Sequence, residues 1–234
     1  MDGFKATPSP SPIGFRPAAV LFDMDGLMIE SERSLLECWR QATRDLNLAL
    51  EDTLWLSMIG LSDAACARML RERLPEAEAE ALTACTQALY DLRVESGLPL
   101  RPGVRRMLDW IERLGVPRAV VTSTHRWRTE QKLERCGLRR YFRILATGDE
   151  VHASKPAPDI YLLAATRLGV DPARCVALED SLPGVRAALA AGMTPIQVPD
   201  LVAPDDAARA LGHRIVDGLE QARRLLEAAL SRAD

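Results

Sequence analysis

The sequence predicts an α/β protein in which a doubly wound, Rossmann-like parallel sheet carries an inserted all-helical cap. Three observations lead to this prediction. Short apolar strands alternate with helices over residues 99–198, which is typical of a parallel sheet with helices on both faces. A wholly apolar strand near the N-terminus ends in two acids, Asp23 and Asp25. A helical stretch follows that strand and interrupts the alternation once.

The apolar run at residues 18–22 is interpreted as the first strand, buried on both faces. Asp23 and Asp25 then lie at its carboxyl end, where open parallel sheets place their chemistry. Two carboxylates this close repel each other. A cation, a shared proton or a catalytic task normally accounts for such a pair.

Helical periodicity begins at Ser31, which we expect to be the N-cap, and we find no convincing strand before residue 98. A helical insert placed directly after the acidic strand can act as a lid over it. We expect three parts in the chain: a flexible tail rich in proline and serine (1–16), an α/β core (17–30 and 99–234) and a helical cap (31–98).

The remaining elements alternate in order along the second half of the chain. The expected strands are 119–121, 142–146, 175–178 and 194–198. The expected helices are 102–114, 126–136, 160–168, 183–191 and 219–230. A glycine follows four of these helices, at positions 115, 137, 169 and 192, and serves as the stop signal.

Composition excludes several classes of function. The net charge of -3 leaves no basic excess for binding nucleic acid. The five cysteines are scattered without Cys-x-x-Cys spacing, which favours reduced thiols over disulfides or a zinc site. No apolar run reaches the roughly 18 residues of a membrane span, and no signal peptide is recognisable. We therefore expect a cytoplasmic monomer without a membrane or nucleic-acid partner.

Polar residues follow several of the predicted strands. Besides the first pair of acids they are Thr122, Ser123, Thr124, Lys155, Glu179 and Asp180. The carboxyl ends of parallel strands lie along one edge, so these residues are expected to converge on one crevice. Carboxylates without histidine or cysteine ligands favour Mg²⁺. Lysine and hydroxyl donors suit phosphate.

Each group taken alone also has a structural explanation. Asp180 can cap a helix, the Thr-Ser-Thr sequence can form a turn, and Lys155 can lie on the surface. Glu30 and Glu32 can simply be solvated residues at the start of a helix. The occurrence of all the strand-end groups in one alternating chain favours the site.

These residues match a known pattern. Asp23-Met24-Asp25-Gly26, Thr122, Lys155-Pro156 and Glu179-Asp180-Ser181 resemble, in this order, the four motifs of the haloacid dehalogenase-like hydrolase superfamily. The helical insert resembles the cap of its β-phosphoglucomutase-like branch. The resemblance covers residues 18–198 and includes all four motifs and the cap position.

The resemblance implies a role for each matched residue. Asp23 would be the nucleophile that forms an aspartyl-phosphate, and Asp25 the general acid and base. Mg²⁺ would be held by Asp23, the Asp25 carbonyl and Asp180, with Glu179 acting directly or through water. Thr122 and the Ser123 amide would hold phosphoryl oxygens, and Lys155 would neutralise charge. The other substrate- or phosphate-binding residues expected are Gly26, Glu32 and Thr124.

The resemblance therefore implies a Mg²⁺-dependent phosphatase of a small phosphomonoester, such as a sugar phosphate. Glu30-Ser31-Glu32 resembles the Asp-Ser-Glu of the branch's phosphatases, whereas the histidine and arginine of its mutases fall on Leu35 and Asp63. The turn at residues 60–63 and the helix start at 30–36 are expected to face the leaving group. The alternatives are a β-phosphoglucomutase-like phosphotransferase and a non-catalytic switch that keeps its phosphoryl group. The role of His125 stays open.

Overall fold

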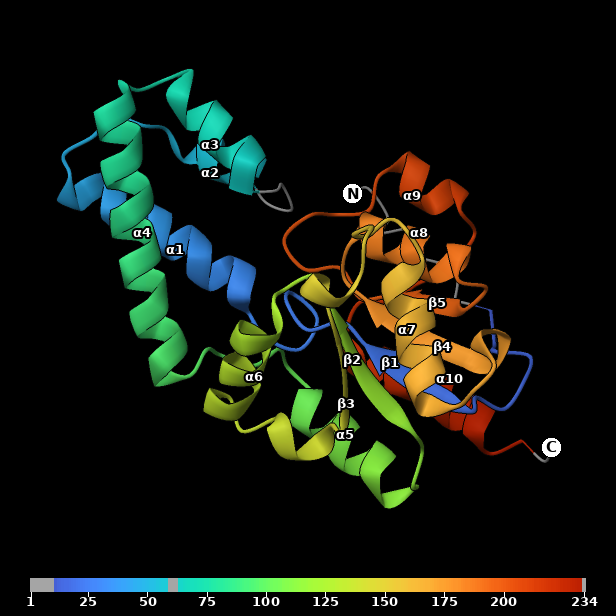
Figure 1. Ribbon diagram of the computed structural model, residues 1–234. Helices are drawn as coiled ribbons and strands as arrows, with labels where there is room; N and C mark the ends of the chain where they lie inside the picture. The colour runs from blue at the N-terminus through green and yellow to red at the C-terminus, as the bar shows by residue number, and fades with distance from the viewer. Residues whose placement is uncertain (1–10, 59–62, 233–234) are drawn as a thin grey trace, which may run out of the picture.

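A computed structural model describes residues 11–58 and 63–232 of the chain. Figure 1 shows a sheet with helices on both faces and a separate group of helices, α1 to α4, beside it. The sheet is six-stranded and parallel, in the order β3-β2-β1-β4-β5-β6. Its strands are β1 (Ala19–Phe22), β2 (Arg118–Thr122), β3 (Ile144–Thr147), β4 (Cys175–Glu179), β5 (Thr194–Gln197) and β6 (Arg214–Ile215). The predicted fold class is confirmed.

Helices cover both faces of the sheet, which explains why its central strand is apolar throughout. Val20 and Phe22 of β1 pack into one apolar cluster, and Ala19 and Leu21 pack into a second cluster on the opposite face. The first cluster includes side chains of α5 (Val104–Arg113), α6 (Arg126–Arg135) and α10 (Leu219–Leu230). The second includes side chains of α7 (Asp159–Leu168) and α8 (Leu182–Ala190). Shorter helices are η1 (Arg139–Tyr141), η2 (Gly148–Glu150), η3 (Pro172–Arg174) and α9 (Asp206–Ala210).

The four cap helices follow β1 and form an apolar cluster of their own. They are α1 (Ser31–Asp45), α2 (Asp52–Met58), α3 (Asp63–Arg71) and α4 (Glu76–Ser96). Trp39 of α1 stacks on Trp55 of α2, with 5.3 Å between ring centroids and an interplanar angle of 7°. Leu36, Trp55 and Leu82 are buried in this cluster, and Leu201 packs against it from the loop after β5.

The chain enters and leaves the cap helices along two adjacent segments. The Glu30 amide donates to the Pro99 carbonyl at 2.9 Å, and the Arg101 amide donates to the Met28 carbonyl at 3.0 Å. The loop after β5 makes a second connection. The carboxylate of Asp200, which is 3% exposed, accepts hydrogen bonds from Arg33 of α1 and from Arg101. The cap therefore contacts the sheet lobe at more than its covalent junction.

The structure differs from the sequence-based expectation at several points. Glu30, rather than Ser31, is the N-cap of α1, and α1 ends at Asp45. The chain then turns through Asn47, whose φ of 52° is left-handed, before α2 begins. Strand β6 was not predicted, because a strand of two residues is too short to show alternating apolar and polar positions.

Residues 11–16, the described part of the expected flexible tail (1–16), contact the sheet lobe. Ile13 is only 1% exposed and lies in the first apolar cluster. The guanidinium of Arg214 donates to the carbonyl oxygens of Ser11 at 2.6 Å and Pro12 at 2.7 Å. Phe15 packs against the same cluster, and the proline-rich composition concealed both apolar residues. Among the helices that the structure describes, none is long and apolar enough to cross a bilayer.

Candidate active site

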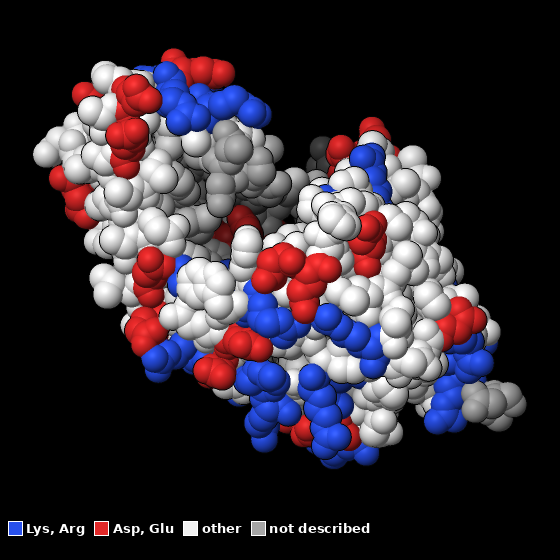
Figure 2. All heavy atoms as spheres, in the orientation of Figure 1, with Lys and Arg blue, Asp and Glu red and all other residues white. Residues whose placement is uncertain are grey.

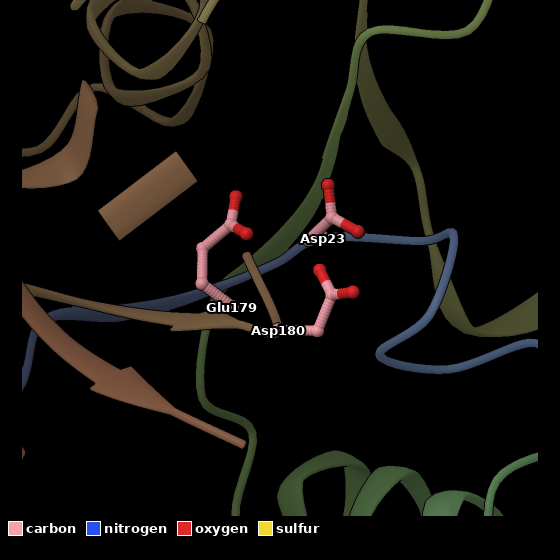
Figure 3. A group of neighbouring side chains, drawn as sticks. All are labelled: Asp23, Glu179 and Asp180. Atoms are coloured by element: carbon pink, nitrogen blue, oxygen red, sulfur yellow. The ribbon is translucent and has the colours of Figure 1, made fainter. Parts of the chain in front are cut away.

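Three carboxylates meet at the carboxyl ends of the two central strands. Asp23 follows β1, Glu179 ends β4, and Asp180 follows it. The Asp23 amide donates to the Leu178 carbonyl at 3.0 Å, which extends the pairing of β1 with β4 up to the acids. Figure 3 shows the three side chains pointing toward one another, and one oxygen from each lies within 4.8 Å of the others.

Lys155 lies inside this group of acids. Its ammonium donates to Asp23 Oδ1 at 2.6 Å, to Glu179 Oε1 at 2.6 Å and to the Val121 carbonyl at 3.1 Å, which uses all three of its protons. Burial alone would lower the pKa of Lys155, but Asp23 and Glu179 raise it above the ordinary value. Lys155 is therefore a fixed positive charge.

Two glycines leave room for the carboxylates. A Cβ atom on Gly184 would lie 2.0 Å from the carboxyl carbon of Glu179. A Cβ atom on Gly26 would lie 2.1 Å from Asp180 Oδ2, and the φ of Gly26 is +82°, in the left-handed region. A larger residue at either position would displace one of the acids. Both glycines thus help to build the site.

The charges of this cluster fit a divalent cation. Three carboxylates face one ammonium, so ionisation of all four groups leaves two negative charges. Burial and the nearby Glu179 raise the pKa of Asp23 well above its usual range, although Lys155 opposes this. Burial, Asp23 and Glu179 likewise raise the pKa of Asp180. Within the described part of the chain no hydrogen-bond donor reaches the Asp180 carboxylate, and an oxygen-seeking cation such as Mg²⁺ would satisfy it.

Asp25 lies in a different electrostatic environment from Asp23. Its Oδ1 accepts a 2.7 Å hydrogen bond from the Lys132 ammonium, and its Oδ2 accepts a 2.7 Å hydrogen bond from the Thr124 hydroxyl. Burial alone would raise the pKa of Asp25, but Lys132 and Thr124 lower it below the ordinary value. The pKa values of the two acids of the first motif are therefore shifted in opposite directions. Nearby carboxylates and burial raise that of Asp23, and the Lys132 ammonium lowers that of Asp25.

The other residues singled out from the sequence lie around these groups. The Thr122 hydroxyl accepts a hydrogen bond from the Thr124 amide at 3.2 Å and lies 3.5 Å from Asp25 Oδ2. Ser123 is exposed, and its carbonyl lies 2.1 Å from where a Cβ atom on Gly148 would be. His125 is exposed at the N-cap position of α6.

Glu32 is half-buried in the first turn of α1. Its charge contributes to the raised pKa values of Asp180 and Tyr90, so it lies near both the sheet lobe and α4. Figure 2 shows a hollow between the cap helices and the sheet lobe, with acidic atoms at its base. The turn at residues 60–62 and the side chain of Asp63, expected to face the leaving group, lie outside the described residues.

Three residues of this region were not found from the sequence: Tyr90, Lys132 and Tyr161. The Tyr161 hydroxyl donates to Glu179 Oε1 at 2.6 Å, and Tyr90 contacts Lys132 across the cap boundary. A signal for Lys132 was present, because it shares the buried stripe of α6 with Thr129, Leu133 and Cys136. A lysine on a buried helical stripe indicates a buried ion pair.

Comparisons with known proteins agree with this arrangement. The family model described as haloacid dehalogenase-like hydrolase matches residues 17–192. The "Phosphorylated carbohydrates phosphatase" of Thermotoga maritima is 33% identical over 178 residues, which are 75% of this chain and 82% of the relative. A fructose-1-phosphate phosphatase of Escherichia coli is 33% identical over 186 residues, which are 78% of this chain and 97% of the relative.

Solved structures share the whole architecture. A hydrolase of the same superfamily from Deinococcus radiodurans, solved with bound phosphate and sodium, superimposes with a TM-score of 0.77 at 30% identity. The match covers 93% of this chain and 99% of that one. The β-phosphoglucomutase of Clostridium difficile shares the fold at 19% identity, with a TM-score of 0.68 over 92% of this chain and 100% of its own.

Proposed function

The chain belongs to the haloacid dehalogenase-like hydrolases as a phosphatase of small phosphorylated metabolites, and we propose that it works through a phosphorylated Asp23 with Mg²⁺ as cofactor. The observation that carries this proposal is the convergence of Asp23, Glu179 and Asp180 around the Lys155 ammonium. Such a cluster suits a nucleophilic carboxylate that must approach a phosphate anion.

In the first half-reaction a carboxylate oxygen of Asp23 forms a bond to phosphorus, and the bond from phosphorus to the ester oxygen breaks. Asp25 must first take up a proton, against the preference that Lys132 and Thr124 give to its ionised form; the departing oxygen then takes this proton, and the alcohol leaves. Lys155 neutralises part of the charge near the attacking carboxylate, to which it is held at 2.6 Å. The products are an aspartyl-phosphate, the free alcohol and ionised Asp25.

In the second half-reaction the Asp25 carboxylate takes a proton from water, whose oxygen attacks phosphorus. The bond from phosphorus to Asp23 breaks, which releases inorganic phosphate and restores both acids. Lys132 and Thr124 favour the ionised form of Asp25 that this step requires. Thr122 and the backbone amide of Ser123 would hold the phosphoryl oxygens.

The cofactor would be held by Asp23, Asp180, the backbone carbonyl of Asp25 and Glu179. Mg²⁺ bound there lowers the repulsion between carboxylate and phosphate. Gly26 leaves the space in which the Asp180 carboxylate lies, and Glu32 faces the same region from α1. The cap helices would enclose the leaving group. We propose residues 31–98 as this functional unit, with the sheet lobe as the catalytic one.

The substrate class proposed is a phosphorylated sugar or sugar alcohol. Support comes from the named activities of relatives: one acts on phosphorylated carbohydrates, one on fructose 1-phosphate, and a third, 35% identical over 199 residues, is a hexitol phosphatase. Glu32 and the helix start around it offer acceptors for sugar hydroxyl groups.

The proposal is tested by phosphate release from an aryl phosphate and from a panel of phosphorylated sugars. We expect release only with Mg²⁺, and no turnover by D23N. Activity of D23N at the wild-type rate, or full activity in chelator, would contradict the proposal. Conversion of β-glucose 1-phosphate to glucose 6-phosphate would instead indicate a mutase, and a long-lived acyl-phosphate under native conditions a switch protein.

A further inference from the structure

Lys132 is a buried lysine that none of the four motifs contains. Its side chain is 6% exposed, and its ammonium lies 2.7 Å from Asp25 Oδ1. The ring of Tyr90, from cap helix α4, lies with its centroid 5.5 Å from the same ammonium. Burying an ammonium costs free energy unless its partners compensate. Its carboxylate partner belongs to the proposed reaction, so the contact has a chemical meaning as well as a structural one.

The Asp25 carboxylate is held at both of its oxygens. Lys132 donates to Oδ1 and Thr124 donates to Oδ2, each at 2.7 Å. One donor on each oxygen fixes the rotation of the carboxylate plane as well as its position. Thr124 lies in the loop after β2, whereas Lys132 reaches Asp25 from the second turn of α6. The two donors therefore approach from different elements and cannot replace each other.

We propose that Lys132 is the positioning residue for Asp25, and that it orients this carboxylate for both proton transfers. The proposal depends on the role given to Asp25 under the proposed function. Lys132 does not touch Asp23, Glu179 or Lys155 in any contact of the described residues, so its influence on the reaction passes through Asp25. Tyr90 covers the ammonium from the cap side, so Lys132 contacts Asp25 and Tyr90 but none of the cluster carboxylates.

The expected effect follows from what orientation contributes to proton transfer. General acid–base catalysis is worth about 10²- to 10⁴-fold in rate, and a misplacement of about 1 Å can cost about 10²-fold. Removal of the ammonium in K132M leaves Asp25 Oδ1 without its cationic donor, so the carboxylate is held mainly by Thr124 and Thr122 at Oδ2 and can rotate. We expect kcat to fall about 30- to 100-fold, while KM changes by less than about twofold.

Arg128 provides a matched control on the same helix. Its guanidinium lies 5.6 Å from the same Tyr90 ring, and it pairs with Asp91 of α4. Like Lys132, Arg128 is a cationic residue of α6 that contacts Tyr90 and bridges to the cap. Unlike Lys132, it does not contact Asp25. We expect R128M to keep kcat within about twofold of the wild-type value.

The experiment measures kcat and KM with an aryl phosphate and Mg²⁺ for wild type, K132M, K132Q, R128M, D25N and D25N/K132M. Circular dichroism and thermal melting confirm that each variant is folded. If Lys132 acts through Asp25, K132M slows the wild-type enzyme 30-fold or more but slows D25N by less than twofold. K132Q keeps a shorter, uncharged donor and should lose about tenfold in kcat.

Several results would overturn the inference. One such result is a folded K132M or K132Q whose kcat is within twofold of the wild-type value. Another is a K132M substitution that lowers kcat by the same factor in D25N as in the wild type. A loss in R128M as large as in K132M would indicate that the cap bridge, rather than Asp25, is affected. If K132M does not fold, K132Q takes its place in the same comparison. A fast D25N would contradict the proposed function itself, whereas a slow D25N with a fast K132M would contradict only the role of Lys132.

Discussion

The phenol of Tyr161 donates a 2.6 Å hydrogen bond to Glu179 Oε1, and both side chains are fully buried. Lys155 donates to the same oxygen, so Glu179 Oε1 is fixed from two sides. Its other oxygen, Oε2, accepts from the Ser181 hydroxyl at 3.2 Å. Glu179 is therefore oriented by the protein before any cation arrives.

The first prediction concerns this hydrogen bond. Y161F should raise the Mg²⁺ concentration needed for half-maximal activity about tenfold, because partners that orient a metal ligand are worth about 10- to 100-fold in affinity. It should also lower the free energy of unfolding by about 1–3 kcal/mol. Activity is measured over a Mg²⁺ titration. Y141F is the control, because its hydroxyl donates at 2.6 Å to Asp109, outside the carboxylate cluster. Equal Mg²⁺ dependence in both variants would contradict the prediction.

The second prediction concerns the room left by Gly184. G184A should reduce kcat/KM at least tenfold, because the added methyl group occupies the position of the Glu179 carboxylate. The matched control is G218A, since a Cβ atom there meets nothing within 4 Å and the φ of Gly218 is extended at 178°. Steady-state kinetics of the two variants check the prediction. It would be wrong if G184A were as active as G218A.

The third prediction concerns repulsion within the carboxylate cluster. Removing one buried negative charge should relieve it, so D180N should melt at a higher temperature than the wild type in chelator. Mg²⁺ should raise the melting temperature of the wild type and should barely affect D180N, which lacks a ligand. Thermal melting with and without Mg²⁺ measures both effects. A Mg²⁺-induced shift of equal size in the two proteins would contradict the proposed ligand set.

The fourth prediction concerns acid stability and a carboxylate away from the site. Hydrogen bonds from Arg167, Arg126 and Thr147 lower the pKa of Glu150 from 4.5 to about 2. A group whose pKa is lower in the folded than in the unfolded protein stabilises the folded state at pH values above its unfolded pKa. The contribution of Glu150 to stability is therefore complete above about pH 5. It is lost as the pH falls from about 4.5 toward 2.

Because Glu150 is exposed and solvent screens its ion pairs, E150Q should be about 1 kcal/mol less stable than the wild type at pH 7, with a smaller difference at pH 3. Urea unfolding at both pH values tests this. E130Q is the control, because Glu130 also pairs with Arg126, at 3.4 Å, but is 40% exposed and should contribute less than about 0.5 kcal/mol. A pH-independent difference between E150Q and the wild type would show that the ion pairs are not the cause.

Much of the site could be predicted because sheet topology determines which residues meet. Asp23 and Glu179 lie at the ends of adjacent parallel strands, and Lys155 lies in the segment between β3 and α7. Their convergence follows once the strands are known to be parallel. The roles of these residues came from the resemblance to a family and not from spacing.

Helix rotation and cap placement could not be predicted in the same way. Lys132 and Tyr161 lie on helices, and which atom they reach depends on how each helix is rotated against the sheet. Tyr90 reaches Lys132 only because α4 lies next to α6. Periodicity identifies a buried face but not the partner it meets. Ile13 and Phe15 were missed for a simpler reason, since two apolar residues next to a proline-rich stretch are too few to show a period.

The cap helices have an apolar cluster of their own, and they also place Cys38 of α1 and Tyr90 and Val94 of α4 in the first cluster of the sheet. Cap substitutions that leave these three side chains in place should therefore alter neither the strand packing nor the spacing of Asp23, Glu179 and Asp180. In evolutionary terms, the choice of substrate and the cleavage of the phosphate ester can change independently. If the cap encloses the leaving group as proposed, substitutions in the cap helices can change which substrate is accepted while the reaction itself stays the same.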